Sequence, residues 1–350
     1  MKKNWNNFLG DKQAQQRLIQ RSEIIFSIRN FFRERGFLSV ETPTIVAYPG
    51  LEPNLDPFVT EVIRNDGAKF PAYLITSPEY ACKKLLAAGH ERIFEITRCY
   101  RNGEPWGDRH NHEFTMIEWY RAQADYRIIM EDTEQLVQTL AEQLFNSTVI
   151  EYQGQKLDLT VPWPRLTVAE AFEHYADIDL LSLLGDVEKF RVVAEQKNCV
   201  VTNDDSFEDL FFKIFLRDIE PNLGQGQPVF LSEYPREMAA LSRLKPDDSR
   251  LAERFEVYAC GLELANAFSE LTDSIEQRRR LEQEQVERAR LGKIVTAIDE
   301  DFIEAVSQMP AAAGIALGVD RLVMLLTNAP TIQDILFFPA ADLFITDNHV

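Results

Sequence analysis

Two arginines mark one segment of the sequence as a candidate phosphate-binding site. Arg101 and Arg109 lie in the stretch RCYRNGEPWGDRHNHEFTMIEWY, a polar segment that ends in aromatic residues. A guanidinium is always charged and pairs its planar fork of donors with phosphate oxygens, so two arginines in one loop indicate a polyphosphate ligand. The alternative interpretation is an exposed hairpin whose charges are only solvated.

The residues that follow this loop alternate in a way that suits a ligand. In an extended strand every second side chain lies on the same face, which places Phe114, Met116, Glu118 and Tyr120 together. This face offers a flat ring for stacking, followed by a carboxylate and a phenol for a polar group.

A second set of polar residues lies in RFEVYACGLELANAFSELTD. If a hairpin turns at residues 259–260, Glu256 and Glu263 become direct cross-strand neighbours, which is destabilising for two like charges unless something compensates. Magnesium could compensate, since it accepts one or two carboxylates and takes its other ligands from water and phosphates. Asn266 and Glu270 continue this polar series. A solvated edge hairpin in another register is the alternative.

A third segment, GIALGVDRLVML, carries two glycines and an arginine. Gly314 and Gly318 allow a backbone to approach a ligand closely. Arg321 is expected in the first turn of a following helix, where the guanidinium and the helix N-terminus could both meet a phosphate. Packing alone would also explain this spacing.

Hydrophobic periodicity predicts the elements that must position these residues. Strands that pair with their neighbours, with helices elsewhere, favour an α+β fold over a doubly wound sheet. We expect one domain over residues 1–350, with an insertion at about 165–250 between VPWPR and LKPDDSR. The expected elements are helices at 17–35 (ended by Gly36), about 125–145 and 274–291, strands at 92–101, 113–121 and 253–268, and a strand followed by a helix at 314–325.

Composition indicates a cytoplasmic enzyme with an ordinary core. The chain of 350 residues is 45% hydrophobic and 27% charged. Its N-terminus has no apolar run of signal-peptide length, and no segment approaches the roughly 18 apolar residues of a membrane span. Four cysteines lie far apart without a CxxC pair, which favours reduced structural thiols over zinc or a disulfide framework; they are Cys82, Cys99, Cys199 and Cys260.

The net charge of −19 argues against a nucleic-acid partner. Proteins that bind nucleic acid through its phosphates usually carry a basic excess. A local basic patch would be needed to reverse this expectation.

The three segments together resemble the signature motifs of class II aminoacyl-tRNA synthetases, specifically the lysine-type members. GFLSVETPTI is similar to motif 1 of that superfamily, FEITRCYRN…RHNHEFTMIEWY to motif 2, and GIALGVDRLVMLL to motif 3. TSPEYACKKLLAAGHERIFEI and GLELANAFSELTD also resemble the lysine-type pattern. The resemblance covers about residues 17–338 and thins through the expected insertion.

The resemblance implies ATP and Mg²⁺ as cofactors, and roles for individual residues. Arg101 and Arg321 would be catalytic, with Arg101 at the α-phosphate. Phe114 would stack on adenine. Arg109 and Arg321 would hold the outer phosphates. The other implied nucleotide-binding residues are Asn102, Gly103, Glu104, His110, Asn111, Glu263, Leu264 and Gly318. Glu256 and Glu263 would bind magnesium. The implied amino-acid pocket consists of Ser77, Pro78, Glu79, Glu118, Tyr120, Asn266, Glu270 and Ala316.

Within this superfamily the sequence most resembles the elongation factor P–(R)-β-lysine ligases. Only about 16 residues precede the motif 1 helix, where lysyl-tRNA synthetases carry an anticodon-binding barrel. Ser77 and Ala316 stand where synthetases usually have Ala and Gly. The implied reaction activates (R)-β-lysine, or lysine more poorly, and transfers it to a lysine of elongation factor P, with tRNA disfavoured as the acceptor.

Three positions depart from the family pattern. Gly103 stands where Glu usually follows RN, His112 replaces the usual Pro before EF, and Ala267 replaces Gly. Two other functions remain open: a minimal lysine-type enzyme that charges tRNA, and a catalytically silent regulatory paralogue.

The motif 1 segment also predicts a homodimer. Phe31, Phe32 and Phe37 form an apolar set that is excessive for the surface of a monomer. A two-fold interface is a common way to bury such a patch.

Overall fold

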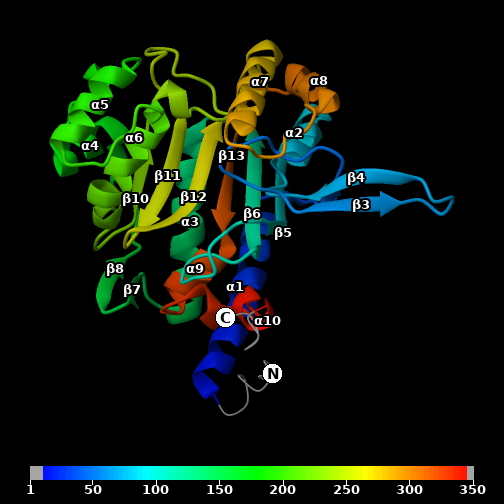
Figure 1. Cartoon of the computed structure of the whole chain (residues 1–350). Helices are drawn as coiled ribbons and strands as arrows, with labels where there is room; N and C mark the ends of the chain where they lie inside the picture. Colours follow the sequence, from blue (N-terminus) through cyan, green and yellow to red (C-terminus); the bar gives the residue numbers. More distant parts are fainter. Residues whose placement is uncertain (1–10, 345–350) are drawn as a thin grey trace. The chain divides into compact units, whose positions relative to one another are not determined.

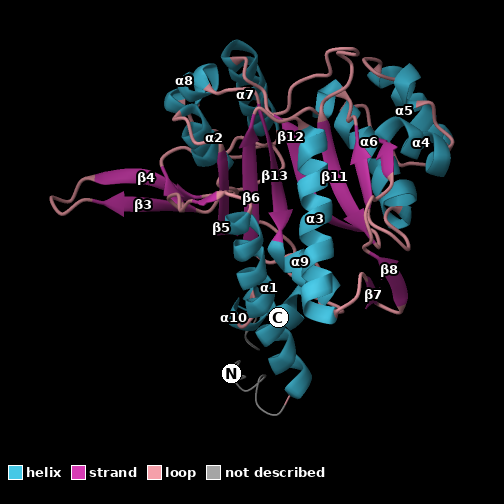
Figure 2. Cartoon of the chain, turned by 180° about the vertical axis from the view of Figure 1, so that it is seen from behind, coloured by secondary structure: helices cyan, strands magenta, loops and turns pink. Residues whose placement is uncertain are grey.

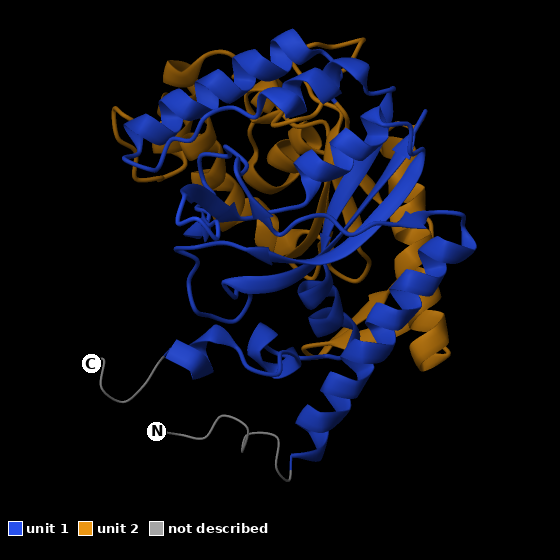
Figure 3. Cartoon of the chain, turned by 90° about the vertical axis from the view of Figure 1, so that its right-hand side faces the viewer, with its two compact units in different colours: residues 1–123, 271–350 blue, residues 124–270 orange. Residues whose placement is uncertain are grey.

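The structure, a computed structural model, describes residues 11–344. The chain forms two compact units, residues 1–123 with 271–350 and residues 124–270 (Figure 3). Every element expected to carry motif 2 or motif 3 lies in unit 1, and the expected insertion at about 165–250 lies within unit 2.

Unit 1 contains a sheet portion with the strand order β1-β5-β6-β13. Strand β1 runs parallel to β5, while the β5–β6 and β6–β13 pairs are antiparallel. A second, antiparallel sheet has the order β2-β4-β3, and its β3–β4 hairpin extends away from β5 and β6 (Figure 1). The strands are β1 (Leu38–Ser39), β2 (Ile45–Val46), β3 (Val59–Ile63), β4 (Lys69–Leu74), β5 (Arg92–Tyr100), β6 (Glu113–Ala122) and β13 (Ala312–Gly318).

The helices of unit 1 form two groups. Helix α2 packs against α8, and α8 against α7, at one end of the β5–β6 pair (Figure 1). Helix α1 packs against α9 and β1. The helices are α1 (Lys12–Glu34), α2 (Glu79–Ala87), α7 (Ser274–Arg290), α8 (Glu300–Gln308), α9 (Val319–Leu326), the short 3-10 helix η6 (Ile332–Ile335) and α10 (Ala340–Phe344).

Helix α1 begins at a side-chain cap and ends at a glycine. The Asp11 carboxylate accepts hydrogen bonds from the backbone N–H groups of Gln13 and Ala14, both at 3.0 Å. Gly36 has a φ of +77°, a left-handed conformation that glycine adopts at helix C-termini without strain. The expected helix at 17–35 is therefore confirmed, with a start five residues earlier.

The phenylalanines of this helix have a different role from the one expected. Phe31, Phe32 and Phe37 are 3%, 0% and 6% exposed, so the chain's own core buries them. The Phe32 ring centroid lies 5.2 Å from that of Phe94 and 4.9 Å from that of Trp119. The prediction that these three residues form a surface patch is wrong, because the strands of the same unit cover them.

Unit 2 contains a sheet portion with the order β12-β11-β10-β9. The β11–β12 and β10–β11 pairs are antiparallel and β9 is parallel to β10. A separate hairpin is formed by β7 and β8. The strands are β7 (Val149–Tyr152), β8 (Gln155–Asp158), β9 (Arg165–Thr167), β10 (Val229–Ser232), β11 (Arg254–Ala259) and β12 (Leu262–Ser269).

Helix α3 packs against β12, and the other helices of unit 2 enclose an aromatic core (Figure 2). The ring centroid of Phe211 lies 4.8 Å from that of Phe172 and 5.4 Å from that of Phe215. The helical segments of unit 2 are α3 (Tyr126–Phe145), α4 (Val168–Ala176), η2 (Leu180–Ser182), α5 (Val187–Gln196), α6 (Phe207–Ile214), η3 (Phe215–Ile219), η4 (Glu220–Asn222) and η5 (Arg236–Met238).

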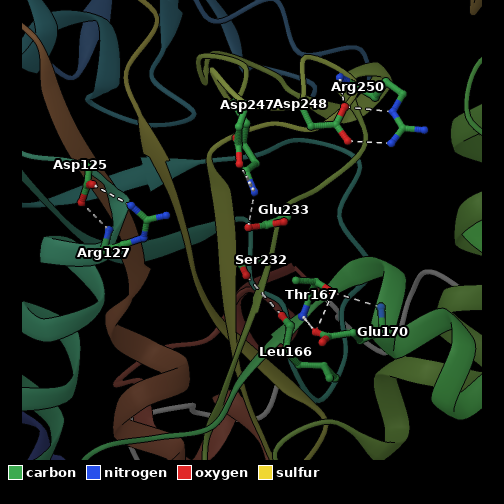
Figure 4. A network of polar contacts seen from close by, with 11 residues as sticks. Asp125, Arg127, Leu166, Thr167, Glu170, Ser232, Glu233, Asp247, Asp248 and Arg250 are labelled. Carbon is green, nitrogen blue, oxygen red and sulfur yellow. Dashed lines mark hydrogen bonds and ion pairs between the residues drawn. The ribbon is translucent and has the colours of Figure 1, made fainter. Parts of the chain in front are cut away.

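Polar contacts fix the ends of several elements in unit 2 (Figure 4). Thr167 and Glu170 form a reciprocal capping box at the start of α4, in which the Glu170 backbone N–H donates to Thr167 Oγ1 at 3.1 Å. The Ser232 hydroxyl donates to the Leu166 carbonyl at 3.4 Å and so links β10 to β9. These contacts fix the start of α4 and link β9 to β10, the strand that borders β11.

The expected α+β class is confirmed, as are the helices near 125–145 and 274–291 and the strands near 92–101, 113–121 and 253–268. Among the described residues no helix is long and apolar enough to span a membrane. All four cysteines are free thiols; Cys82 and Cys99 are buried, whereas Cys199 and Cys260 are half-buried.

Candidate active site

The first part of the site lies in unit 1, where Arg101 follows the end of β5 beside β6. The Arg101 backbone N–H donates to the His112 carbonyl at 2.9 Å, which fixes the residue at the mouth of the motif 2 loop. Its guanidinium carbon lies 5.0 Å from the ring centroid of Phe114, within cation–π range. Arg101 Nε is buried and has no hydrogen-bond partner within residues 11–344. A buried guanidinium N–H without an acceptor is expected where a ligand supplies the acceptor.

The loop after Arg101 begins with a close backbone contact. The Asn102 backbone N–H donates to the Asp56 carbonyl at 2.7 Å. Gly103 has a φ of +73°, and its N–H donates to Asn102 Oδ1 at 3.0 Å. Position 103, where the family usually has Glu, therefore lies in a left-handed turn that glycine adopts without strain. The Glu104 carboxylate lies 3.9 Å from the His110 ring nitrogen Nε2.

Cationic groups surround His110. Arg321 Nη2 lies 3.1 Å from His110 Nε2, and because a guanidinium only donates, the imidazole nitrogen accepts. Burial and then the charge of Arg321 lower the pKa of His110, with further lowering from Arg101 and Arg109 and an opposing effect of Glu104. A neutral histidine next to three arginines leaves their positive charge available to a polyphosphate.

Arg321 lies in the first turn of α9, as the sequence predicts. Gly318 is the residue before the helix, and Asp320 is fixed from two sides. Its carboxylate accepts the Thr115 backbone N–H at 2.8 Å and pairs with Arg21 at 2.5 Å. This buried pair joins α1, β6 and α9, so it holds Arg321 in place relative to the motif 2 strand.

Asn111 has contacts with the chain itself. Its Oδ1 accepts the Ala340 backbone N–H at 2.8 Å, and its Nδ2 donates to the Glu113 carbonyl at 2.6 Å. The Ile332 N–H also donates to the Asp108 carbonyl at 2.7 Å. The C-terminal segment therefore anchors the motif 2 loop, and a direct contact of Asn111 with nucleotide stays a prediction.

The middle of β6 carries the amino-acid part of the site. Glu118 is 1% exposed and its Oε2 accepts the Tyr120 hydroxyl at 2.7 Å, which confirms that the two side chains share a face. Glu118 Oε1 is buried without a hydrogen-bond partner in the described part of the chain. Burial, followed by the charge of Glu79, raises the pKa of Glu118 well above its usual value. Ala316 of β13 pairs directly with Glu118.

Helix α2 supplies the neighbouring carboxylate. Glu79 is its first residue, and Lys83 Nζ lies 2.5 Å from Glu79 Oε1. The Glu79 backbone N–H lies 3.4 Å from the Ser77 hydroxyl oxygen, and Pro78 at the N-cap position is buried. The TSPE segment therefore places Ser77 and Glu79 together at the start of the helix.

The remaining predicted site residues lie on the β11–β12 hairpin of unit 2, whose register differs from the expected one. The turn is at Cys260 and Gly261, with φ values of +52° and +67°, and the register shifts between Val257 and Tyr258. Glu256 therefore pairs with Asn266, and Glu263 with Tyr258. The prediction that Glu256 and Glu263 are direct neighbours is wrong, because the turn lies one residue later and a bulge follows it.

Glu256 is surrounded by donors from its own unit. Its Oε2 accepts the hydroxyl groups of Tyr234 and Tyr258, both at 2.6 Å, and its Oε1 pairs with Arg254 Nη2 at 2.6 Å. Arg254 Nε also donates to Asn266 Oδ1 at 3.1 Å. Arginine and tyrosine therefore provide the compensation that we had expected from a metal ion.

Binding of magnesium by Glu256 and Glu263 stays a prediction. Glu256 and Glu263 lie on the same face, since Glu263 pairs with Tyr258 and Tyr258 bonds Glu256. Two carboxylates match the small protein contribution to magnesium sites completed by phosphates and water. Residues 11–344 contain no group of three or more His, Cys, Asp or Glu side chains that could hold a metal by themselves.

The other residues predicted on this hairpin are buried or half-buried. Leu264 is 3% exposed, and Glu270 is 1% exposed where it bridges to Ser242. Asn266 is half-buried. Their contacts with substrate stay predictions.

Sequence reasoning missed the side chains that position Glu256, and it missed one more carboxylate in unit 1. The alternation of Arg254, Glu256 and Tyr258 along β11 was a usable signal for the first set. Tyr234 is distant in sequence and could not be assigned. Glu52, in the segment PGLEPN, is half-buried near Glu79, and nothing in the local pattern indicates this.

Comparison with known proteins agrees with this geometry. Residues 1–342 match the family described as tRNA synthetases class II (D, K and N). The chain belongs to this family and has the fold of its catalytic domain.

Among curated proteins the chain is similar to several bacterial enzymes named lysine–tRNA ligase. The protein from Pelotomaculum thermopropionicum is 41% identical over 323 residues, covering 91% of this chain and 62% of that protein. The protein from Moorella thermoacetica is 39% identical over 328 residues, covering 93% and 65% respectively. The Bacillus subtilis protein is 38% identical over 322 residues, covering 92% and 63%. The chain thus spans less than two thirds of the length of these relatives.

Proposed function

We propose that this protein activates lysine or (R)-β-lysine with ATP, forming an aminoacyl-adenylate and pyrophosphate. The observation that carries the proposal is Glu118, a buried carboxylate with one oxygen unpartnered among residues 11–344, beside Glu79. Phe114, which suits a nucleotide, lies at the start of the same strand, and Arg101 stacks against its ring from the end of β5. An acidic pocket suits a diamino acid, and the names of the relatives support lysine.

The chemistry needs no covalent enzyme intermediate. A carboxylate oxygen of the amino acid attacks the α-phosphorus, the bond to the oxygen bridging to the β-phosphorus breaks, and pyrophosphate leaves. Arg101 would stabilise the charge that develops on the α-phosphate, and Arg321 would hold the outer phosphates. Phe114 would position the adenine, so that binding energy orients the two reactants. Magnesium, when bound, would offset phosphate charge; Glu256 and Glu263 are the residues proposed to hold it.

We propose two candidate acceptors for the activated amino acid. The names of the relatives support tRNA, the acceptor of lysine–tRNA ligases. The net charge of −19, together with Ser77 and Ala316 in the pocket, supports a lysine amine of elongation factor P, which would form an amide and release AMP. Both share the adenylate step.

Two experiments test this function. ATP–pyrophosphate exchange is expected with lysine or with (R)-β-lysine. If neither amino acid supports exchange, only a regulatory, non-catalytic role remains. Labelled amino acid, ATP and magnesium are then offered with purified elongation factor P or total tRNA, and the labelled product identifies the acceptor.

We also propose a homodimer, on a different surface from the one expected. Phe26 and Ile19 of α1 are 65% and 52% exposed, and Leu38 and Ile45 of the short strands β1 and β2 are 49% and 51% exposed. Sedimentation at micromolar concentration is expected to give roughly 80 kDa, twice the 40.3 kDa chain. A single monomeric species would contradict this proposal.

A further inference from the structure

The loop before β3 places a carboxylate in an unusual position. Glu52 is half-buried, but its Oε2 is fully buried and has no hydrogen-bond donor within the described residues. A Cβ atom on Gly50 would lie 2.3 Å from this oxygen, closer than real contacts allow. The backbone at Gly50 therefore packs directly against the Glu52 carboxylate, in space that a side chain at position 50 would obstruct.

A buried arginine beside this loop donates to its backbone and not to the Glu52 carboxylate. Arg288 of α7 is 2% exposed, and its Nη1 donates to the carbonyls of Glu52 at 2.9 Å and of Leu55 at 2.7 Å. Its Nε donates to the Ile294 carbonyl, and its Nη2 lies 3.5 Å from Asp56. Arg288 thus holds the loop by its backbone and makes its side-chain ion pair with Asp56.

Two further carboxylates lie near Glu52. Burial and then the charge of Glu79 raise the pKa of Glu52. Burial and then the charges of Glu52 and Glu79 raise the pKa of Glu284 to about 8. Burial, aided by all three of these charges, raises the pKa of Tyr80 well above its usual value. The like charges therefore face a common region.

The basic residues around this acidic group do not satisfy it: the charges of Arg101 and Arg288 act on Glu52 without restoring its ordinary pKa. Lys83 is paired with Glu79, and Arg280 lies 2.9 Å from Glu276. Arg280 and Arg288 both oppose the raised pKa of Glu284 without restoring it to the ordinary value. The region therefore keeps an excess of carboxylates.

Glu118 provides an independent sign that a cationic group belongs here. It is 1% exposed, its Oε1 lacks a donor among residues 11–344, and Glu79 is the nearby charge that affects it most. Unpartnered buried oxygens thus occur on two residues, Glu52 and Glu118, that both interact with Glu79. Each such oxygen is costly unless a donor arrives with a ligand.

The missing partner has the chemistry of an alkylammonium group. Among the described residues, Glu52, Glu79 and Glu118 do not form a group of three carboxylates that could hold a metal by themselves. An ammonium donates three hydrogen bonds and can connect carboxylates that are further apart.

We propose that Glu52 is a specificity-determining residue that binds an ammonium group of the diamino acid together with Glu79. Glu284 contributes a third carboxyl group to the same region. This inference rests on the proposed adenylation of lysine or (R)-β-lysine. It adds a residue from a loop that none of the three motifs contains.

The test is ATP–pyrophosphate exchange by the full chain carrying Glu52→Gln. The wild type is first assayed with lysine, (R)-β-lysine and norleucine, which has a methyl group in place of the ε-ammonium. Glu52→Gln is expected to raise KM for the preferred diamino acid by about 10- to 100-fold, the usual effect of losing a charged hydrogen bond. The change in kcat should be small, and discrimination against norleucine should fall by a similar factor if the ammonium bound is the terminal one.

A matched control separates this role from a general charge effect. Glu61→Gln removes an exposed carboxylate on β3 and is expected to leave KM unchanged. Removing the Glu52 charge relieves repulsion, so the thermal stability of the free protein should stay the same or rise. If Glu52→Gln does not fold, Glu52→Asp keeps the charge but shortens the side chain, and it should also raise KM.

The outcomes distinguish the two proposals. No exchange by the wild type with any diamino acid would overturn the adenylation function itself. Exchange by the wild type with an unchanged KM in Glu52→Gln, or in Glu52→Asp if that variant must be used, would overturn the role of Glu52 alone. Lower stability of the free protein with an unchanged KM would assign Glu52 a structural role.

Discussion

Three buried or half-buried carboxylates, Glu256 of unit 2 and Glu118 and Glu52 of unit 1, differ in how their oxygens are satisfied. In unit 2, Glu256 receives hydrogen bonds from Tyr234, Tyr258 and Arg254. In unit 1, Glu118 and Glu52 each keep a buried oxygen without a donor among residues 11–344. A satisfied carboxylate stabilises the fold that surrounds it, whereas an unsatisfied one costs stability until a ligand binds. The comparison indicates that Glu118 and Glu52, unlike Glu256, are held for a ligand.

The largest expected effect is on the free energy of unfolding, and its sign should differ between substitutions at Glu256 and at Glu118. Glu256→Ala leaves Arg254 without its ion-pair partner and should lower the free energy of unfolding by about 3 kcal/mol. Glu118→Gln removes like-charge repulsion with Glu79, so stability should stay the same or rise while lysine-dependent exchange falls. Urea unfolding of both variants measures this contrast. Equal destabilisation by the two substitutions would break the comparison.

Substitution of Arg101, like substitution of Glu118 or Glu52, should have a large effect on activity and a small one on folding. Arg101→Ala is expected to lower kcat for exchange by about 100-fold or more, since it removes a preorganised contact to the transition state. Its Nε has no partner among the described residues, so little stability should be lost. Near-normal exchange by this variant would remove Arg101 from the proposed mechanism.

The pH dependence of stability should reveal the raised pKa of Glu284, which lies near Glu52 and Glu79. Glu284 has its pKa raised from 4.5 to about 8 by burial and by Glu52 and Glu79, with Arg280 and Arg288 opposing. Between these values the folded chain keeps a proton that the unfolded chain has lost. The contribution of Glu284 to stability is therefore full below about pH 4.5, falls as pH rises through this window, and levels off above about 8.

The variant Glu284→Gln should flatten this fall, because the amide does not titrate. Denaturation midpoints in urea between about pH 5 and about pH 9 measure the slope. Glu282→Gln, on the exposed side of the same helix α7, is the matched control and should keep the wild-type slope. A Glu284→Gln protein with the wild-type slope would show that this carboxyl does not carry the effect.

The smallest expected effect concerns the shape of the pocket. Ala316 pairs with Glu118 across β13 and β6, so its methyl group borders the carboxylate. Ala316→Gly should shift the preference between (R)-β-lysine and lysine by about 10-fold or less, the usual effect of one small group in a pocket. Ratios of kcat/KM for the two amino acids measure this shift. An unchanged ratio would mean that Ala316 has no part in selecting the isomer.

Local pattern predicted most of the elements and part of the site. Period-two alternation placed Glu118 and Tyr120 on one face, and the Tyr120 hydroxyl does bond Glu118. Helix α1 is specified by its apolar spacing and by Gly36 at its end. These features depend on contacts between residues a few positions apart, and such contacts follow from sequence spacing alone.

Only the tertiary structure decided which carboxylates are satisfied. The left-handed turn at Cys260 and the bulge after Val257 reset the register of Glu256, and strand periodicity does not show a one-residue shift of this kind. Glu52, Glu79 and Glu284 come from three segments far apart in the chain, and Phe32 is covered by strands that follow much later. The sequence by itself determined which side chains face together along a strand or a helix. Burial and charge coupling arise from long-range packing, so the folded chain alone determines where a ligand is needed.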